Sequence, residues 1–249
     1  MKLRYYILLA VCSCFFFVVA LFPAALAWKL LPTSLTQGLP IKVEQVGGTV
    51  WDGFVVGSLN TGPVRGSNVF SWDLNPLWLL LADVSSGLHA EGENFKLTGT
   101  AHVGLLGKGF SDLNGKVDTQ LVNDLLKQMG AKAEGELVVS NVTLDFGSGT
   151  DVNDASGTLS WAGGPVSYRQ GRNSQNLDLP AVKGTLTQQD GGVLLSVVES
   201  KSQAKLAELT LKGPVGGVVV YKRVMKIAGL SEPEDEDAVL VQIQQPIFM

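Results

Sequence analysis

Short β-rich runs, each beginning at a glycine, recur along most of this chain and restrict the class of fold that it can adopt. They begin at Gly48, Gly99, Gly115, Gly135, Gly157 and Gly184. From Gly99 onward the spacings are 16, 20, 22 and 27 residues, which indicates a meander rather than a strict repeat. Parallel strands need crossover segments of a dozen or more residues, and these short Gly-rich connections favour antiparallel hairpins instead. The sequence therefore predicts a mainly β body, built as a curved antiparallel β-meander sheet or partial barrel.

Two segments show the alternation expected of strands with one buried face. In Val142–Phe146 the apolar and polar side chains alternate strictly, and Lys205–Lys212 repeats the pattern. A further strand is expected at Ala238–Gln245, after a run of acidic residues at 232–237. That run lacks the spacing and glycine of a calcium loop, and we interpret it as a solvated loop.

Two or three short helices are expected beside the sheet or at its ends. Residues 75–82 begin with Asn75-Pro76, typical of a proline-started helical turn. Residues 118–130 place their apolar side chains on one helical face, with Asp118 as the N-cap and Gly130 as the C-cap. Residues 218–229 form the third candidate. These segments are too few for a layer of helices over the sheet.

The N-terminal segment differs from the rest because Tyr5 to Trp28 contains no charged residue. At 1.5 Å per residue it can cross a hydrocarbon core of about 30 Å. Tyr5, Tyr6 and Trp28 stand at its ends, where aromatic side chains favour the membrane interface. The predicted organisation is a cytoplasmic N-terminus at 1–4, a transmembrane anchor at 5–28, a connector at 29–40 and an exported β-rich domain at 41–249.

A cleaved signal peptide is the alternative, with Ala25-Leu26-Ala27 as its cleavage site. The apolar region is longer than the 7–15 residues of an ordinary signal, which favours a retained anchor. Lys2 and Arg4 precede the segment and hold the N-terminus in the cytoplasm, so both alternatives export the body. We expect a single-pass membrane protein.

Charge and cysteine content exclude several classes of protein. Nineteen Lys and Arg against 23 Asp and Glu give a net charge of −4, without the basic surface of a nucleic-acid-binding domain. Cys12 and Cys14 both lie in the apolar segment. The body therefore has no disulfide, cysteine metal site or thiol nucleophile.

No catalytic, metal or cofactor site is predicted. His89 and His102 are the only histidines and lack the spacing of a zinc site. Ser202 and Lys205 form an S-x-x-K match of the kind that arises about once by chance at this composition. The sequence thus predicts a protein that is not an enzyme. Its tryptophans are expected to be core residues with paired indole N–H groups.

Two short elements resemble type II secretion system protein N, also called general secretion pathway protein N. The first is Gly48-Thr49-Val50-Trp51-Asp52-Gly53, and the second is Trp72-Asp73-Leu74-Asn75-Pro76-Leu77. They fit the G-T-[LV]-W-x-G and W-x-[LF]-x-P-L patterns of that family, in order and just after the anchor. The matching residues, structural or contact-making, are Gly48, Thr49, Trp51, Gly53, Trp72, Pro76 and Leu77. The chain departs from the family at Asn75, where Asp is usual, and in the acidic run at 232–237.

The resemblance implies an accessory, periplasm-facing structural subunit of the inner membrane, supporting export of folded proteins across the outer membrane. Other secretion subunits would be its partners, and the family has no catalytic residues to carry over. The alternative is a similarity to AsmA-like proteins, whose curved sheets handle lipid. An apolar strand face left open as a groove favours lipid handling, and a face closed by packing favours the scaffold.

Overall fold

The computed structural model describes residues 2–32, 41–59, 67–76, 83–104, 107–128, 131–147, 151–170, 173–227, 229 and 233–246. Its helices are α1 (Lys2–Ala20), α2 (Ala24–Leu30), α4 (Gln120–Gln128) and α5 (Arg223–Ile227). The first strands are β1 (Ile41–Gly48), β2 (Asp52–Leu59), β3 (Asn68–Leu74), β4 (Asp83–Gly92), β5 (Phe95–Gly104), β6 (Lys108–Asp118), β7 (Ala131–Ala133) and β8 (Glu136–Phe146). The remaining strands are β9 (Val152–Trp161), β10 (Gly164–Gln170), β11 (Asn173–Leu179), β12 (Val182–Gln189), β13 (Gly192–Glu199), β14 (Lys205–Lys212), β15 (Val215–Tyr221) and β16 (Val239–Pro246).

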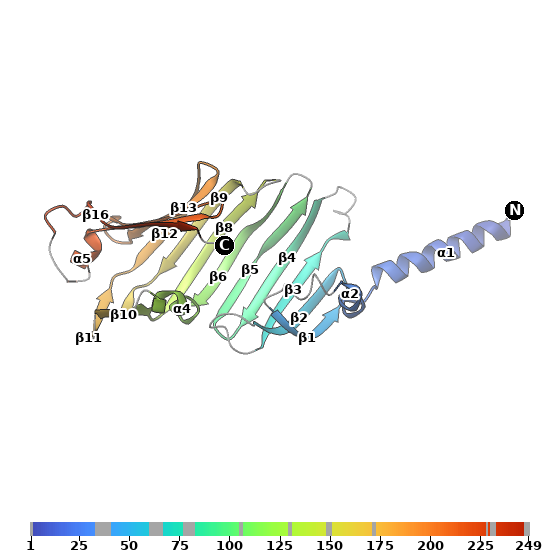
Figure 1. The fold of residues 1–249 in the computed structure, drawn as a ribbon. Helices are drawn as coiled ribbons and strands as arrows, with labels where there is room; N and C mark the ends of the chain where they lie inside the picture. The colour runs from blue at the N-terminus through green and yellow to red at the C-terminus, as the bar shows by residue number, and fades with distance from the viewer. Residues whose placement is uncertain are drawn as a thin grey trace.

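Thirteen of these strands form one large antiparallel sheet (Figure 1). The strands follow one another in chain order from β1 to β16, except that β7, β10 and β11 leave to form a small three-stranded sheet. The large sheet is not closed, and β1 and β16 are its two edges. The expected antiparallel meander is therefore confirmed, in the form of an open sheet.

One row of paired residues shows how the two faces differ. It crosses all thirteen strands and contains only apolar residues and glycine. Its members are Val46, Val55, Phe70, Ala90, Leu97, Gly115, Val139, Leu159, Gly184, Val197, Ala207, Val220 and Val241. Because cross-strand partners share a face, the face with this row, here called the inner face, carries an unbroken apolar row from edge to edge.

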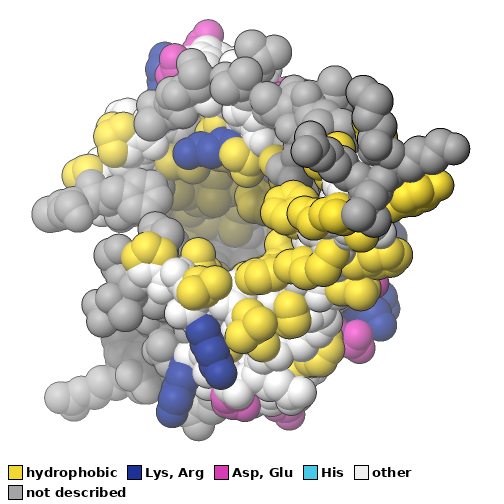
Figure 2. All heavy atoms as spheres, turned by 90° about the vertical axis from the view of Figure 1, so that its right-hand side faces the viewer, with side chains coloured by type: hydrophobic (Ala, Val, Ile, Leu, Met, Phe, Trp, Pro, Cys, Tyr) yellow, Lys and Arg dark blue, Asp and Glu magenta, His cyan; other side chains and the backbone are white. Residues whose placement is uncertain are grey.

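The inner face is only partly covered. Buried apolar side chains gather on β8 and β9, at Val139, Val152, Ala155 and Trp161. Toward β16 the same face is open, with Leu209 38% and Ile243 44% exposed. Seen from the side of α1, the molecule contains a hollow lined with hydrophobic side chains (Figure 2). The sheet thus curls around an apolar trough.

The N-terminal segment is not the single helix expected over residues 5–28. α1 ends at Ala20, and α2 begins again at Ala24 and runs through Lys29 and Leu30, which were expected in the connector. The break falls at Pro23, which has no N–H for the helix ladder. Within the part of the chain that the structure describes, no helix combines the length and the apolar character needed to cross a membrane.

The expected short helices have three different outcomes. The helix at 118–130 is confirmed as α4, and the Asp118 carboxylate accepts a hydrogen bond from the Gln120 N–H at 2.7 Å. Gly130 lies outside the described residues. The helix expected at 218–229 is wrong up to Tyr221, because the β-branched residues of β15 pair between β14 and β16, and only α5 is helical. Of the turn expected at 75–82, only Asn75 and Pro76 are described.

Candidate functional site

The Gly48–Gly53 element forms a tight turn between β1 and β2. The Thr49 N–H donates to the Asp52 carbonyl at 2.7 Å, and the Asp52 N–H donates to the Thr49 hydroxyl at 3.0 Å. Gly48 has a φ of +79°, and a side chain there would meet the Asp52 carbonyl oxygen. Thr49 and Gly48 are therefore required by the turn itself.

This turn holds the N-terminal helices against the sheet. The Trp51 indole Nε1–H donates to the Val19 carbonyl at 2.9 Å. In a continuous helix that carbonyl would accept from residue 23, but residue 23 is a proline. The Val50 N–H also donates to the Phe22 carbonyl at 3.0 Å, and Pro23 forms a bridge with Thr49. The end of α1 is thus connected to the first hairpin by three backbone-directed contacts.

The second element completes the same junction. The Trp72 indole Nε1–H donates to the Val50 carbonyl at 2.9 Å, and the Leu74 N–H donates to the Trp51 carbonyl. Gly53 pairs with Trp72, and a Cβ at Gly53 would lie 2.6 Å from the Trp72 ring. Glycine is therefore needed where the indole crosses β2.

Five of the seven family-motif residues meet at this junction: Gly48, Thr49, Trp51, Gly53 and Trp72. Pro76 is exposed just beyond the end of β3, and Leu77 lies outside the described residues. Trp51 and Trp72 have paired indole N–H groups, as expected, but both rings are only partly buried and lie at the junction rather than in a sealed core.

The sequence reasoning did not find the partner groups of this junction, the Val19 and Phe22 carbonyls. The sequence signal for them was Pro23, because a proline within the apolar run leaves a preceding helix carbonyl without its usual N–H donor. Of the expected interface aromatics, Tyr5 and Tyr6 are 68% and 66% exposed at the start of α1, whereas Trp28 is partly buried on α2.

The histidines and the S-x-x-K match lie apart from one another. His102 extends past Gly109 to the Asp145 carboxylate, 3.3 Å from its Nε2. His89 lies four register positions away on the neighbouring strand, or about 13 Å along it. The Ser202 hydroxyl donates to Glu199, and the Lys205 ammonium pairs with Glu208. Among the described residues, none of the His, Cys, Asp and Glu side chains forms a group of three that could hold a metal ion.

An ionic cluster joins β14 and β15 on the face opposite the trough. Glu208 accepts from Lys205 at 2.7 Å and from the Tyr221 hydroxyl at 2.9 Å. The Lys205 hydrogen bond holds the pKa of Glu208 below its ordinary value, and Glu208 raises the pKa of Lys205. Burial raises the pKa of Tyr221. The cluster fixes the adjoining strands.

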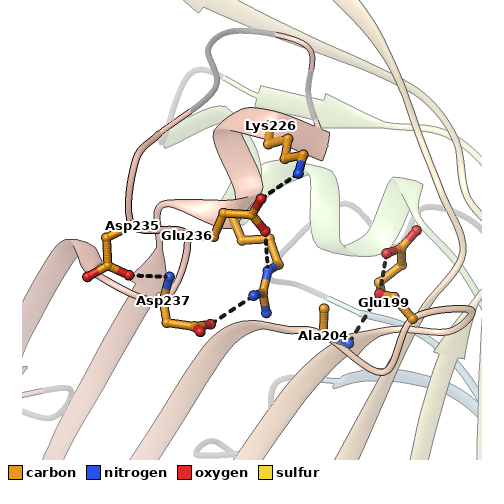
Figure 3. Close-up of polar contacts among 8 residues, drawn as sticks. Glu199, Ala204, Lys226, Asp235, Glu236 and Asp237 are labelled. Carbon is orange, nitrogen blue, oxygen red and sulfur yellow. Dashed lines mark hydrogen bonds and ion pairs between the residues drawn. The ribbon is translucent and has the colours of Figure 1, made fainter.

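The acidic run is partly neutralised by α5 (Figure 3). Arg223 contacts Glu236 at 2.9 Å and Asp237 at 3.0 Å, and Lys226 also pairs with Glu236. Hydrogen bonds from Lys226 and then Arg223 lower the pKa of Glu236. The described part of this run is therefore more ordered than a simple solvated loop, because its acids hold α5 beside β16.

A cavity of about 270 Å³ hollows the inner face near the β16 edge. Its apolar lining includes Val193, Leu195, Leu209, Leu211, Val218 and Ile243. Closure of the inner face by packing distinguishes the scaffold from the lipid-handling alternative. Near the β16 edge the described residues leave this face open.

Comparison with known proteins gives a family match. Residues 40–221 match the family model described as type II secretion system (T2SS), protein N. This range covers most of the chain and includes the hairpin side of the junction and the large sheet as far as β15. No curated protein and no solved structure matches the chain.

Proposed function

Because this chain belongs to the type II secretion system protein N family, we propose that it is an accessory structural subunit of that system at the inner membrane. The family is one of secretion-system components, which supports a role in protein transport through contacts with other subunits. The single observation that carries the proposal is the family match over residues 40–221. The junction also supports the proposed place at the inner membrane, because it connects an apolar helix to a large sheet.

We further propose that α1 anchors the chain and that the sheet faces the periplasm. Side chains around α1 are exposed and apolar, as at Phe15 (70%) and Phe16 (67%), and the helix projects away from the sheet (Figure 1). A helix that is apolar on all sides needs apolar surroundings. From Tyr5 to its end at Ala20, α1 extends about 24 Å, and a bilayer thins locally around a span shorter than its hydrocarbon core.

Lys2 and Arg4 precede this segment, which favours a cytoplasmic N-terminus. A reporter that requires oxidation to fold, fused after residue 249, is therefore expected to be active, and the chain should stay with membranes after carbonate washing. Recovery of the body only as soluble periplasmic protein lacking residues 1–27 would contradict anchoring and establish cleavage.

Partner contacts are tested by co-purification. Full-length protein extracted in mild detergent should bring down other secretion subunits. A matched chain with an unrelated membrane span in place of residues 5–22 distinguishes contacts of the body from contacts of α1. If neither chain retains any secretion subunit, and deletion of the gene leaves export of every type II substrate unchanged, the proposed role is wrong.

A further inference from the structure

We propose that the apolar trough binds an acyl chain of an anionic membrane phospholipid. The proposal concerns a ligand site on the inner face and does not depend on the secretion role. Thirteen strands spaced about 4.8 Å apart make this face roughly 58 Å long, and a single uninterrupted row of apolar residues and glycine runs along it. A surface that is long, hollow and apolar matches the shape of a hydrocarbon chain.

None of the described segments covers the trough at the β13–β16 end. There the cavity of about 270 Å³ is lined mainly by apolar side chains, together with Thr210 and Gln245. Leu209, Leu211 and Ile243 remain 38–44% exposed. Soluble proteins rarely leave a contiguous apolar surface of this kind without a ligand or partner. The described ion pairs near this end, Lys205–Glu208 and Arg223–Glu236, lie outside the cavity lining, which contains no charged side chain and therefore favours an uncharged group.

Two observations point to a lipid rather than a protein as the occupant. First, the hollow is visible from the side of the molecule on which the apolar helix α1 lies (Figures 1 and 2). Second, the pairing of Lys108 with Val103 and Phe146 places a lysine on the inner face, at the first residue of β6. An ammonium group at the rim of an apolar trough complements the phosphate of a lipid whose chain lies inside.

The dimensions agree with this arrangement. β6 and β13 are four strand spacings apart, about 19 Å. One leaflet of a hydrocarbon core of about 30 Å is about 15 Å thick, which approximates the extent of one acyl chain. A headgroup at Lys108 can therefore place the end of its chain near the cavity at β13–β16.

The experiment uses full-length protein in nanodiscs of phosphatidylethanolamine with a phosphatidylglycerol probe that carries a photoreactive acyl chain. Crosslinks mapped by mass spectrometry are expected on inner-face residues of β13–β16. Ile243→Glu should lower this labelling at least fivefold, because it introduces a charge into the cavity. Gln242→Glu is the matched control on the opposite face of the same exposed strand, and it should label like wild type.

Leu209→Glu provides a second charge on the inner face if Ile243→Glu does not fold. A phosphatidylethanolamine probe should label wild type less than the phosphatidylglycerol probe, and Lys108→Gln should remove that difference. Labelling confined to residues 5–22, equal effects of Ile243→Glu and Gln242→Glu, or unchanged lipid preference in Lys108→Gln would overturn the proposal. So would a dimer that Ile243→Glu converts to monomer without changing the labelling, because a second copy would then cover the face.

Discussion

The hydrogen bond from Trp51 to α1 can be tested by removing one proton donor while keeping the aromatic ring. Trp51→Phe removes the indole N–H and leaves the Val19 carbonyl with the Phe22 N–H, 3.3 Å away, as its described donor. A typical intramolecular hydrogen bond contributes about 1 kcal/mol net. Because 1.4 kcal/mol corresponds to a factor of ten, the junction is expected to open about fivefold more often.

Hydrogen exchange in full-length protein in detergent measures this opening. The Val50 N–H, which donates to the Phe22 carbonyl, should lose about fivefold of its protection, whereas amides of the central strands β8 and β9 should be unchanged. Trp161→Phe is a matched control, since the Trp161 indole donates to the Glu134 carbonyl at 3.0 Å, far along the sheet. It should leave the Val50 amide protected.

The competing expectation is that Trp51 is a core residue. Emptying a buried tryptophan site costs about 3–5 kcal/mol and destabilises the whole fold, so Trp51→Ala would then lower protection in every strand of the sheet. A uniform loss in Trp51→Ala, together with no local effect in Trp51→Phe, would refute the proposed connection between the junction and α1.

Three further outcomes are expected. Gly53→Ala should destabilise the first hairpin by about 1–3 kcal/mol in denaturant unfolding, because the added Cβ would contact the Trp72 ring. Gly87→Ala is the control and should change the stability little, because the nearest atom to its Cβ would be 3.9 Å away. Equal effects of the two substitutions would exclude the steric argument. Since the folded-state pKa of Glu208 lies below 4.5, its stabilisation is present above that pH and is lost as the pH falls through the folded pKa. Glu208→Gln should therefore lower Tm by the equivalent of about 0.2–1 kcal/mol at pH 7 and leave Tm unchanged under strongly acidic conditions. A Tm of the variant that stays below the wild-type Tm in acid would disprove this. Both cysteines lie in α1, two residues apart and on different sides of the helix, so no disulfide is expected between them. Tm should therefore be the same with and without reductant, and a reductant-dependent shift would contradict this.

Local patterns in the sequence determined the class of fold. The alternation in Val142–Phe146 and Lys205–Lys212 predicted strands at β8 and β14, because side chains on a strand point to opposite faces in turn. The Asp118 cap and the apolar face after it predicted α4 for the same local reason. The two family-like elements identified most of the junction residues, since turn geometry and glycine requirements are also local.

The tertiary structure decided which groups these elements meet and what the sheet leaves uncovered. Alternation is interrupted at Ser140-Asn141-Val142, and a one-residue slip would turn every later side chain of β8 to the other face. An irregularity in the β8–β9 register between Ser140 and Thr143, with Asn141 at a φ of +49°, keeps Leu144 on the inner face. The contact of Trp51 with the Val19 carbonyl likewise joins residues 32 positions apart, and only folding brings them together. The open apolar trough follows from the same cause, because the curl of thirteen paired strands is a property of the whole sheet.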